Sequence, residues 1–419
     1  MSTQAGAPPA GRGYEIGLLV LLALANGVVA LDRLMASYLS PYIVADLGLS
    51  NTQLGLIGGS LSLAIAISAF GLGRLADATG RRKTILVIGG VLFSLASALG
   101  GFASGFLFLF IARFALGIAE GPMVPVSQSI MADASAPARR GFNMGALQMS
   151  GAFLLGAFVG PVLATQVADA WGWRTAFFLS GAPGLLLALT MALYIRPDPP
   201  RAAREVQPLE IGSTIATLWR VPNMRLTLAV AGLFTAWLAV QNVFLPLFLT
   251  EVKGLAPATM GWVLGMGGLA GITGGIALPA LSDRIGRKPV ATIGCFAGVA
   301  APLALLLLPP EPVLLAIAIL AGWLVLGIAP LYCAVIPSES VSPAMMTSAI
   351  GLAMGVAEIF GGVVAPLAAG MAADAFGLGA TLWLCVGCAI AAGLFCLGLD
   401  ETAPGKRARV SAREATQGW

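Results

Sequence analysis

The stretch Leu75-Ala76-Asp77-Ala78-Thr79-Gly80-Arg81-Arg82-Lys83 joins two long apolar runs of this sequence, and its pattern occurs twice. The other copy, Leu281-Ser282-Asp283 followed by Gly286-Arg287-Lys288, lies 206 residues further along the chain. Ala168-Asp169-Ala170-Trp171-Gly172 likewise matches Ala373-Asp374-Ala375-Phe376-Gly377 at an offset of 205. Matches that stay in register predict an internal repeat, with one unit in each half of the chain.

The composition around this repeat is that of a membrane protein. Of 419 residues, 58% are hydrophobic and 10% are charged, and the mean hydropathy is +0.92. A soluble domain is roughly 45–50% apolar and about 25% charged. Water cannot solvate a surface so poor in charge, so the chain requires the lipid bilayer as its solvent.

Twelve apolar runs are long enough to cross a bilayer, which takes roughly 20 residues per helix. They cover residues 16–45, 51–73, 84–104, 106–133, 142–168, 174–195, 224–250, 257–280, 289–308, 312–336, 344–371 and 379–399. Each half holds an even number of them, so both halves have the same orientation. We predict an all-α membrane protein with two parallel-related six-helix bundles, at residues 1–195 and 224–400. A cytoplasmic linker at 196–223 and a cytoplasmic tail at 401–419 complete the predicted domains.

Positive charge orients the spans. All of the 23 lysines and arginines except Arg33, Arg113, Arg174 and Lys253 fall on the side that holds both termini. By the positive-inside rule this side is the cytoplasm. The first 14 residues have no apolar core, so we expect no cleavable signal peptide. A multi-pass protein of the bacterial inner membrane, with both termini cytoplasmic, is the resulting prediction.

The residues Gly73 to Lys83 resemble the loop between spans 2 and 3 of the major facilitator superfamily, and Arg113 to Gly117 resembles its fourth-span motif. The resemblance covers the whole chain and implies the major facilitator fold, with a substrate site between the halves. It implies a secondary transporter and not an enzyme. We expect a monomer that uses a proton gradient and no cofactor. The sequence has no G-x-x-x-x-G-K-[ST] loop for ATP and no patch for nucleic acid.

The repeated loop is also a candidate gate, because acids at a span end face bases and helix ends across a short turn. The predicted gating residues are Asp77, Gly80, Arg81, Arg82, Asp283, Arg287 and Arg113. The alternative is that the basic residues only set the topology.

Five charged residues lie within the predicted spans and away from the span ends: Asp32, Arg33, Arg113, Glu120 and Glu358. A charge at mid-depth costs roughly 2.5–3.5 kcal/mol on insertion scales unless it is paired or faces water. The alternative to a functional site is a set of salt bridges that fix helix packing.

In the major facilitator superfamily, which this sequence resembles, spans 1, 4, 7 and 10 line the central cavity. This arrangement would bring Arg33 close to Asp32 and Glu120. The Asp32-Arg33 pair, together with Gly117-Ile118-Ala119-Glu120-Gly121-Pro122 in span 4, resembles the anion:cation symporter branch. That resemblance implies that Asp32 and Glu120 bind protons and that Arg33 contacts an organic anion. An anion that occupies Arg33 would free a carboxylate, and a carboxylate without its cation in a low-dielectric site binds a proton. Anion and proton would then load together, as in symport of a carboxylate or sugar acid.

The spinster-like branch, which handles lysolipids, has a similar Asp-Arg pair and span-4 acid. A proton-coupled exporter of drugs or lysolipid-like amphiphiles is therefore the alternative function.

The C-terminal half offers neutral polar groups instead of charges. Predicted substrate contacts besides Arg33 are Gln241, Asn242 and Tyr332, with Tyr38 and Gln148 in the N-terminal half. Their alternative role is hydrogen bonding between helices. Glu358 is predicted to be a further proton-binding residue.

The five cysteines include Cys385 and Cys388, which have the C-x-x-C spacing. A metal or redox site would need further ligands, and the chain has no histidine. We therefore predict buried apolar cysteines and no metal.

Overall fold

A computed structural model describes residues 11–136, 139–197 and 211–403 of the chain. This part is helical and contains no strand, and it holds twelve helical stretches long and apolar enough to cross a membrane. The predicted all-α class and the twelve spans are confirmed, with most boundaries within a few residues.

The N-terminal bundle is built from helices α1 to α9. Their bounds are Arg12–Tyr38 (α1), Ser40–Leu47 (α2), Asn51–Thr79 (α3), Arg82–Gly100 (α4), Phe106–Glu120 (α5), Met123–Ala134 (α6), Arg140–Met149 (α7), Gly160–Trp171 (α8) and Trp173–Tyr194 (α9). A π-helical segment, Ser150–Val159, joins α7 to α8 within one span.

The C-terminal bundle follows a short helix, α10 (Ile211–Trp219), that lies in the predicted linker. The helices of the C-terminal bundle are Pro222–Leu247 (α11), Pro257–Ile285 (α12), Arg287–Ala297 (α13), Ala300–Leu307 (α14), Pro312–Gly322 (α15), Ile336–Glu339 (α16), Met346–Val356 (α17), Ala365–Phe376 (α18) and Gly379–Leu397 (α19). Segments Phe248–Val252, Leu331–Val335 and Ala357–Val364 are π-helical, and Trp323–Ile328 is 3₁₀.

Local sequence explains where the helices begin and turn. Pro222, Pro257 and Pro312 each occupy the first turn of a helix, where a missing N–H costs nothing. The repeated loops turn at Gly80 and Gly286, whose φ angles are 65° and 113°. Glycine adopts these left-handed conformations without strain, which accounts for its recurrence in the motif.

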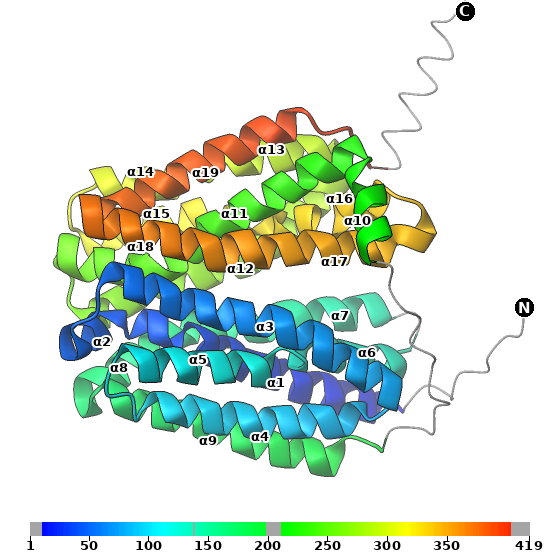
Figure 1. Cartoon of the computed structure of the whole chain (residues 1–419), viewed down its shortest axis with the longest axis horizontal. Coiled ribbons are helices and arrows are strands. Elements are labelled where there is room, and N and C mark those ends of the chain that lie inside the picture. Colours follow the sequence, from blue (N-terminus) through cyan, green and yellow to red (C-terminus); the bar gives the residue numbers. More distant parts are fainter. Residues whose placement is uncertain (1–10, 137–138, 198–210, 404–419) are drawn as a thin grey trace, which may run out of the picture.

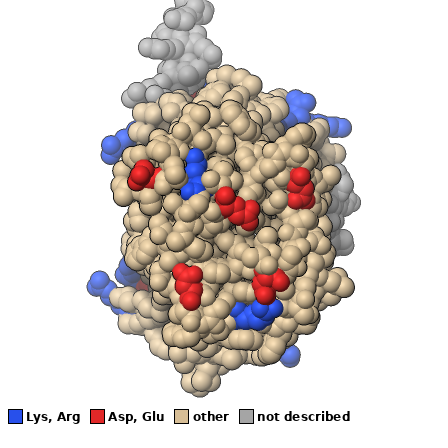
Figure 2. Space-filling model, turned by 90° about the vertical axis from the view of Figure 1, so that its left-hand side faces the viewer, with Lys and Arg blue, Asp and Glu red and all other residues tan. Residues whose placement is uncertain are grey.

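The two bundles lie side by side, one formed by each half of the sequence (Figure 1). The described chain begins and ends at the same end of the molecule, which we call the termini end. The opposite end is called the far end. Figure 2 views the far end and shows mainly uncharged side chains with scattered acidic and basic groups.

Contacts between the bundles are tight toward the far end. A Cβ atom added to Gly55 would overlap the carbonyl of Pro366, and one added to Gly370 would overlap that of Asn51. Gly268 approaches the backbone of Phe158 in the same way. Small residues therefore let α3 pack against α18, and α12 against the Ser150–Val159 segment.

Toward the termini end, three described glycines of α7 and α17 have no such close neighbours. A Cβ atom on Gly145, Gly351 or Gly355 would have no neighbouring heavy atom within 4 Å. The molecule is thus closed between its bundles at the far end and looser at the termini end.

Candidate substrate and proton site

Asp32 lies in a buried polar cluster inside the N-terminal bundle. Its Oδ1 accepts hydrogen bonds from Ser97 of α4 (2.5 Å) and Ser180 of α9 (2.7 Å). Arg113 of α5 donates to the Asp32 backbone carbonyl (3.0 Å) and lies 3.8 Å from Oδ2. The Arg113 guanidinium also stacks over the ring of Phe177. Asp32 is therefore paired with Arg113 inside the N-terminal bundle.

Arg33 forms a different pair. Its Nε donates to Oε1 of Glu120 on α5 at 2.6 Å, and its Nη2 contacts the same oxygen. The Arg33 side chain is 38% exposed, whereas that of Glu120 is fully buried. Arg33 thus links a buried acid to accessible space.

We expected Arg33 to lie close to both Asp32 and Glu120. Among the described ion pairs, Arg33 pairs with Glu120, whereas Asp32 pairs with Arg113. Consecutive side chains on a helix point about 100° apart. Asp32 therefore turns into the bundle, where Arg113 pairs with it, and Arg33 turns toward the opposite bundle. Arg113, predicted as a gating residue, belongs to this intramembrane cluster.

A cavity between the bundles receives the Arg33 side chain. It is lined by Arg33, Ser37 and Arg113 with apolar side chains that include Leu54 of α3 and Val243 of α11. An adjacent cavity brings together Tyr38, Gln241 and Asn242 with Trp323. Three predicted substrate contacts therefore line one space that both bundles share.

The polar groups of this adjacent cavity are held by local hydrogen bonds. The Tyr38 hydroxyl donates to the Gly156 carbonyl (3.1 Å), and Trp323 Nε1 donates to Oε1 of Gln241 (3.2 Å). Tyr332 instead is buried against the ring of Phe234, at 5.7 Å between centroids. The structure thus places Tyr332 behind the cavity wall.

Glu358 lies at the interface, in the π-helical part of its span. It hydrogen bonds Ser62 of α3 in the other bundle, and its charge interacts with those of Arg33 and Glu120. Glu358 is partly exposed. The structure therefore brings this predicted proton-binding residue to the Arg33–Glu120 pair.

The repeated loops form a polar cluster at the termini end of each bundle. Arg82 pairs with Asp133 at 2.6 Å and contacts Ser129, and Lys83 donates to the Ile195 carbonyl at 2.5 Å. Arg81 lies exposed just before α4.

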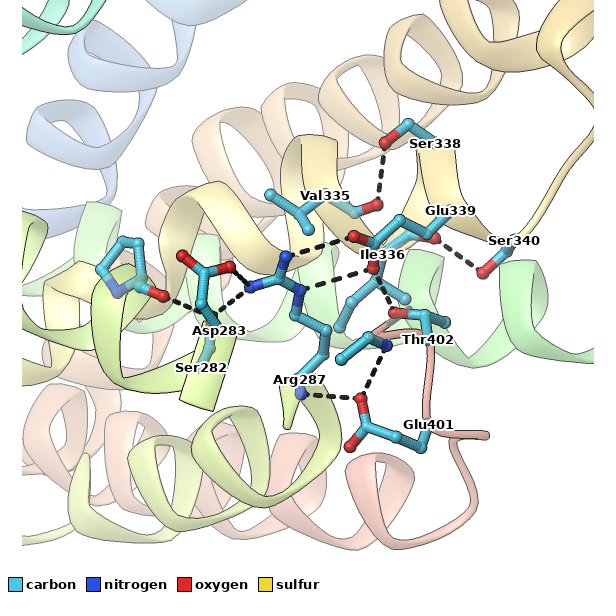
Figure 3. A network of polar contacts seen from close by, with 12 residues as sticks. Ser282, Asp283, Arg287, Val335, Ile336, Ser338, Glu339, Ser340, Glu401 and Thr402 are labelled. Carbon is cyan, nitrogen blue, oxygen red and sulfur yellow. Dashed lines mark hydrogen bonds and ion pairs between the residues drawn. The ribbon is translucent and has the colours of Figure 1, made fainter. Parts of the chain in front are cut away.

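The C-terminal copy is more extensive (Figure 3). Arg287 donates to Asp283 (2.5 Å), Ser282 (2.7 Å) and Glu339 (3.2 Å). Glu401 accepts hydrogen bonds from the backbone N–H groups of Arg287 (2.8 Å) and Lys288 (3.3 Å), at the start of α13. Thr402 donates to Glu339 at 2.6 Å. Residues just after the last span thus close this cluster.

Two predicted residues lie outside the described side chains: Asp77 and Gln148. Sequence reasoning did not select Ser97, Ser180, Trp323, Asp133, Glu339 or Glu401. Serine and tryptophan in apolar runs are equally typical of helix packing. The acids lie at span ends, where charge is ordinary.

The cysteines lie in packed regions of the C-terminal bundle. Cys295 and Cys396 are buried with their sulfur atoms 3.7 Å apart, and Cys385 contacts the Trp237 carbonyl. Within the described residues, no group of three or more His, Cys, Asp or Glu side chains could hold a metal ion.

Comparison with known proteins identifies the class. The family model described as Major Facilitator Superfamily matches residues 22–362 and, in a further match, 240–419. The chain belongs to this superfamily, whose members are membrane transporters and not enzymes.

Among individual proteins, the chain is similar to the probable sulfoacetate transporter SauU of Cupriavidus necator, with 32% identity over 65% of each chain. It is 30% identical to the hexuronate transporter of Bacillus subtilis, over 66% of this chain and 67% of that protein. The sialic acid transporter NanX of Escherichia coli is 28% identical, over 63% and 64%. The matches therefore span about two thirds of these relatives' lengths.

Solved structures share the fold at low identity. A bacterial homolog of the lysosomal transporter Spinster, described as inward-facing and unoccupied, superimposes with a TM-score of 0.75 at 19% identity, over 92% of this chain and 98% of that chain. A D-xylose-proton symporter gives 0.73 at 19%, over 94% and 99%.

Proposed function

We propose that the chain is a proton-coupled symporter that carries a small organic anion, such as a carboxylate or sugar acid, by alternating access. The Arg33–Glu120 pair is the observation that carries this proposal. A guanidinium offers a planar, permanently charged fork for a carboxylate. An anion that takes Arg33 leaves Glu120 buried without its cation, and Glu120 then binds a proton.

Asp32 supplies the other proton-binding acid in the proposal. It exchanges protons while Arg113 and two serines hold it in place. Tyr38, Gln241 and Asn242 would contact the uncharged part of the substrate, and Gln148 remains a further predicted contact. The organic anions in the names of the similar transporters support this substrate class.

The proposed orientation has the termini end in the cytoplasm of a bacterium and the protein in its inner membrane. The distribution of lysine and arginine supports it. With this orientation the loose packing at the termini end corresponds to an inward-facing conformation. The predicted domain boundaries, the tail, the monomeric state and the gating role of the two loop clusters belong to the same proposal.

The decisive experiment measures uptake of organic anions into proteoliposomes while the internal pH is followed. Asp32→Asn and Glu120→Gln are expected to abolish proton-driven accumulation and to keep part of the counterflow exchange. Glu311→Gln, which removes an exposed acid, is the control. Counterflow lost as completely as accumulation would assign structural roles to both acids.

Arg33→Lys tests the anion contact separately. Lysine keeps the charge but loses the fork, so anion affinity should fall about tenfold or more, equivalent to about 1.4 kcal/mol. Isothermal titration of purified protein measures this directly. An unchanged affinity would remove Arg33 from the substrate site.

Export of drugs or lysolipid-like amphiphiles by proton antiport is the second candidate, supported by the fold shared with the Spinster homolog. Arg33 in the cavity favours anions over cationic drugs. The same proteoliposomes loaded with a lysophospholipid or a cationic dye would support export if the inside gains protons as the compound leaves.

A further inference from the structure

The two cavities between the bundles have mostly apolar walls. Hydrocarbon side chains surround the Arg33 side chain in one cavity and the indole of Trp323 in the other. They include Leu54, Ile57 and Val243 near Arg33, and Ala157, Pro246 and Leu264 near Trp323. A substrate that fills this space is therefore enclosed mainly by hydrocarbon and by one aromatic ring.

Most of the neutral polar side chains in these walls already have hydrogen-bond partners. The Tyr38 hydroxyl donates to the Gly156 carbonyl. Both ends of the Gln241 amide are engaged: Nε2 donates to the Trp237 carbonyl, and Oε1 accepts from Trp323 Nε1, both at 3.2 Å. These groups stabilise the cavity wall and leave little hydrogen-bonding capacity for a substrate.

Two neutral side chains of the linings remain free. Within the described residues, the Ser37 hydroxyl and the Asn242 amide have no hydrogen-bond partner, and both side chains are half-buried. A sugar acid carries hydroxyls around its whole ring, and each hydroxyl that is buried without a partner costs free energy. Ser37 and Asn242 are too few to satisfy such a ring.

Trp323 presents a fixed aromatic surface to the cavity. Its Nε1 is held by Gln241, and α12 packs directly on its ring, because a Cβ added to Gly267 would lie 2.6 Å from Trp323 Cε3. The ring of Trp237 lies behind it, at 6.2 Å between centroids. A planar ring gains from stacking on an aromatic side chain beyond the burial of its area, and a fixed partner loses no freedom when it binds.

Resting on the anion transport proposed above, we propose that the substrate is an aromatic carboxylate, a benzoate-like acid, and that sugar acids are rejected. The carboxylate would bind Arg33, and the ring would pack between the apolar walls and Trp323. Ser37 and Asn242 would serve no more than a single polar substituent on the ring. Trp323 is then a specificity-determining residue that the charged pairs of the site do not reveal.

Three monoanions with six-membered rings separate the parts of this proposal: benzoate, cyclohexanecarboxylate and glucuronate. Isothermal titration at neutral pH with the purified full chain measures their affinities. Benzoate should bind at least tenfold more tightly than glucuronate, because its ring needs no hydrogen-bond partner. It should also bind at least threefold more tightly than cyclohexanecarboxylate, which is apolar but cannot stack.

Two variants at one position divide stacking from hydrogen bonding. Trp323→Leu keeps an apolar wall without a ring, so the preference for benzoate over cyclohexanecarboxylate should disappear. Trp323→Phe keeps a ring but loses the bond to Gln241, so this preference should persist. Trp383→Leu removes an exposed tryptophan of α19 and should change no ratio. Melting curves of each variant verify that it is folded.

The inference and the proposed function fail in different ways. If glucuronate binds as tightly as benzoate and Arg33→Lys weakens both, the aromatic class is wrong and the anion contact stands. If benzoate and cyclohexanecarboxylate bind equally to the unmodified protein, Trp323 does not select the ring. Failure of all three acids to bind overturns the inference, and accumulation of another organic anion in the proteoliposomes would still support the proposed function. If Arg33→Lys changes the binding of none of them, the proposed function itself falls.

Discussion

The Asp32–Arg113 and Arg33–Glu120 pairs differ in how much water reaches them. Arg113 is almost fully buried and stacks on Phe177, whereas the Arg33 side chain is 38% exposed. Removal of one partner from a buried pair leaves an uncompensated charge in a low-dielectric interior. An accessible pair can be relieved by water or by a proton, so the two pairs should respond differently to the same substitution.

We predict that Arg113→Gln destabilises the protein by about 3–5 kcal/mol and that Arg33→Gln costs clearly less. Thermal unfolding in detergent, followed by the loss of monodisperse protein, provides the comparison. Adding Asp32→Asn to Arg113→Gln should restore part of the stability, because both charges are then gone. Equal losses for Arg113→Gln and Arg33→Gln would contradict the difference in burial.

The charged residues of the site were predictable from the sequence, but their pairing was not. Acids and arginines stand out in apolar spans because lipid makes them costly. Which way each one points depends on the rotation of its helix in the bundle, and one residue of difference sent Asp32 and Arg33 to different partners. Ser97 and Ser180, which hold Asp32, give no comparable signal because serine is common in membrane helices.

At the level of elements, the first turn of α3 contacts an acidic side chain from the other bundle. Asp374 of α18 accepts hydrogen bonds from the backbone N–H groups of Asn51 and Thr52, both at 2.9 Å, and from the Thr52 hydroxyl at 2.6 Å. These N–H groups have no partner within the helix, and a negative charge is favourable at this helix end. Asp374 thus joins the two bundles at the far end.

Asp374→Ala should therefore favour conformations that are open at the far end, by about 1–3 kcal/mol. Spin labels on cysteines at positions 171 and 376, in a background without the native cysteines, report the separation of the bundles. The expected result is a larger population at long distance.

The repeat supplies a matched control. Asp169 corresponds to Asp374 at an offset of 205, but it accepts a hydrogen bond from Tyr42 within its own bundle. Asp169→Ala should leave the distance distribution unchanged. The same shift in both variants would mean that Asp374 does not act through the contact with α3.

The repeat and the twelve spans were predictable because lipid imposes long apolar runs. The π-helical segments at Ser150–Val159 and Ala357–Val364 were not, although they lie in corresponding spans of the two halves. Their residues are as apolar and glycine-rich as their neighbours, and the change in helical pitch depends on packing against the other bundle. Glu358 lies in one of them, so its direction was hidden as well.

For the whole molecule, the proposed alternating access requires the bundles to meet and separate at the far end. Glycine makes the present closure possible, because α3 and α18 approach more closely than side chains would allow. A bulky residue there acts on the conformational equilibrium and leaves the interior of each bundle intact.

Gly55→Val should consequently prevent the bundles from closing at the far end and reduce transport by at least tenfold, a change of about 1.4 kcal/mol or more. Gly387→Val places the same side chain on an exposed part of α19 where the structure has open space, and it should retain near-normal transport. Uptake assays combined with the 171–376 distance test both variants. A normal distance distribution in Gly55→Val would show that the interface accommodates the added atoms.

The contact of Glu401 with the first turn of α13 has a consequence for biosynthesis. Translation reaches Glu401 only after every membrane span has been made. The backbone N–H groups of Arg287 and Lys288, which donate to Glu401 in the finished protein, therefore lack this acceptor throughout insertion. The C-terminal bundle therefore assembles in an unfinished form, and the last described residues to emerge from the ribosome complete it.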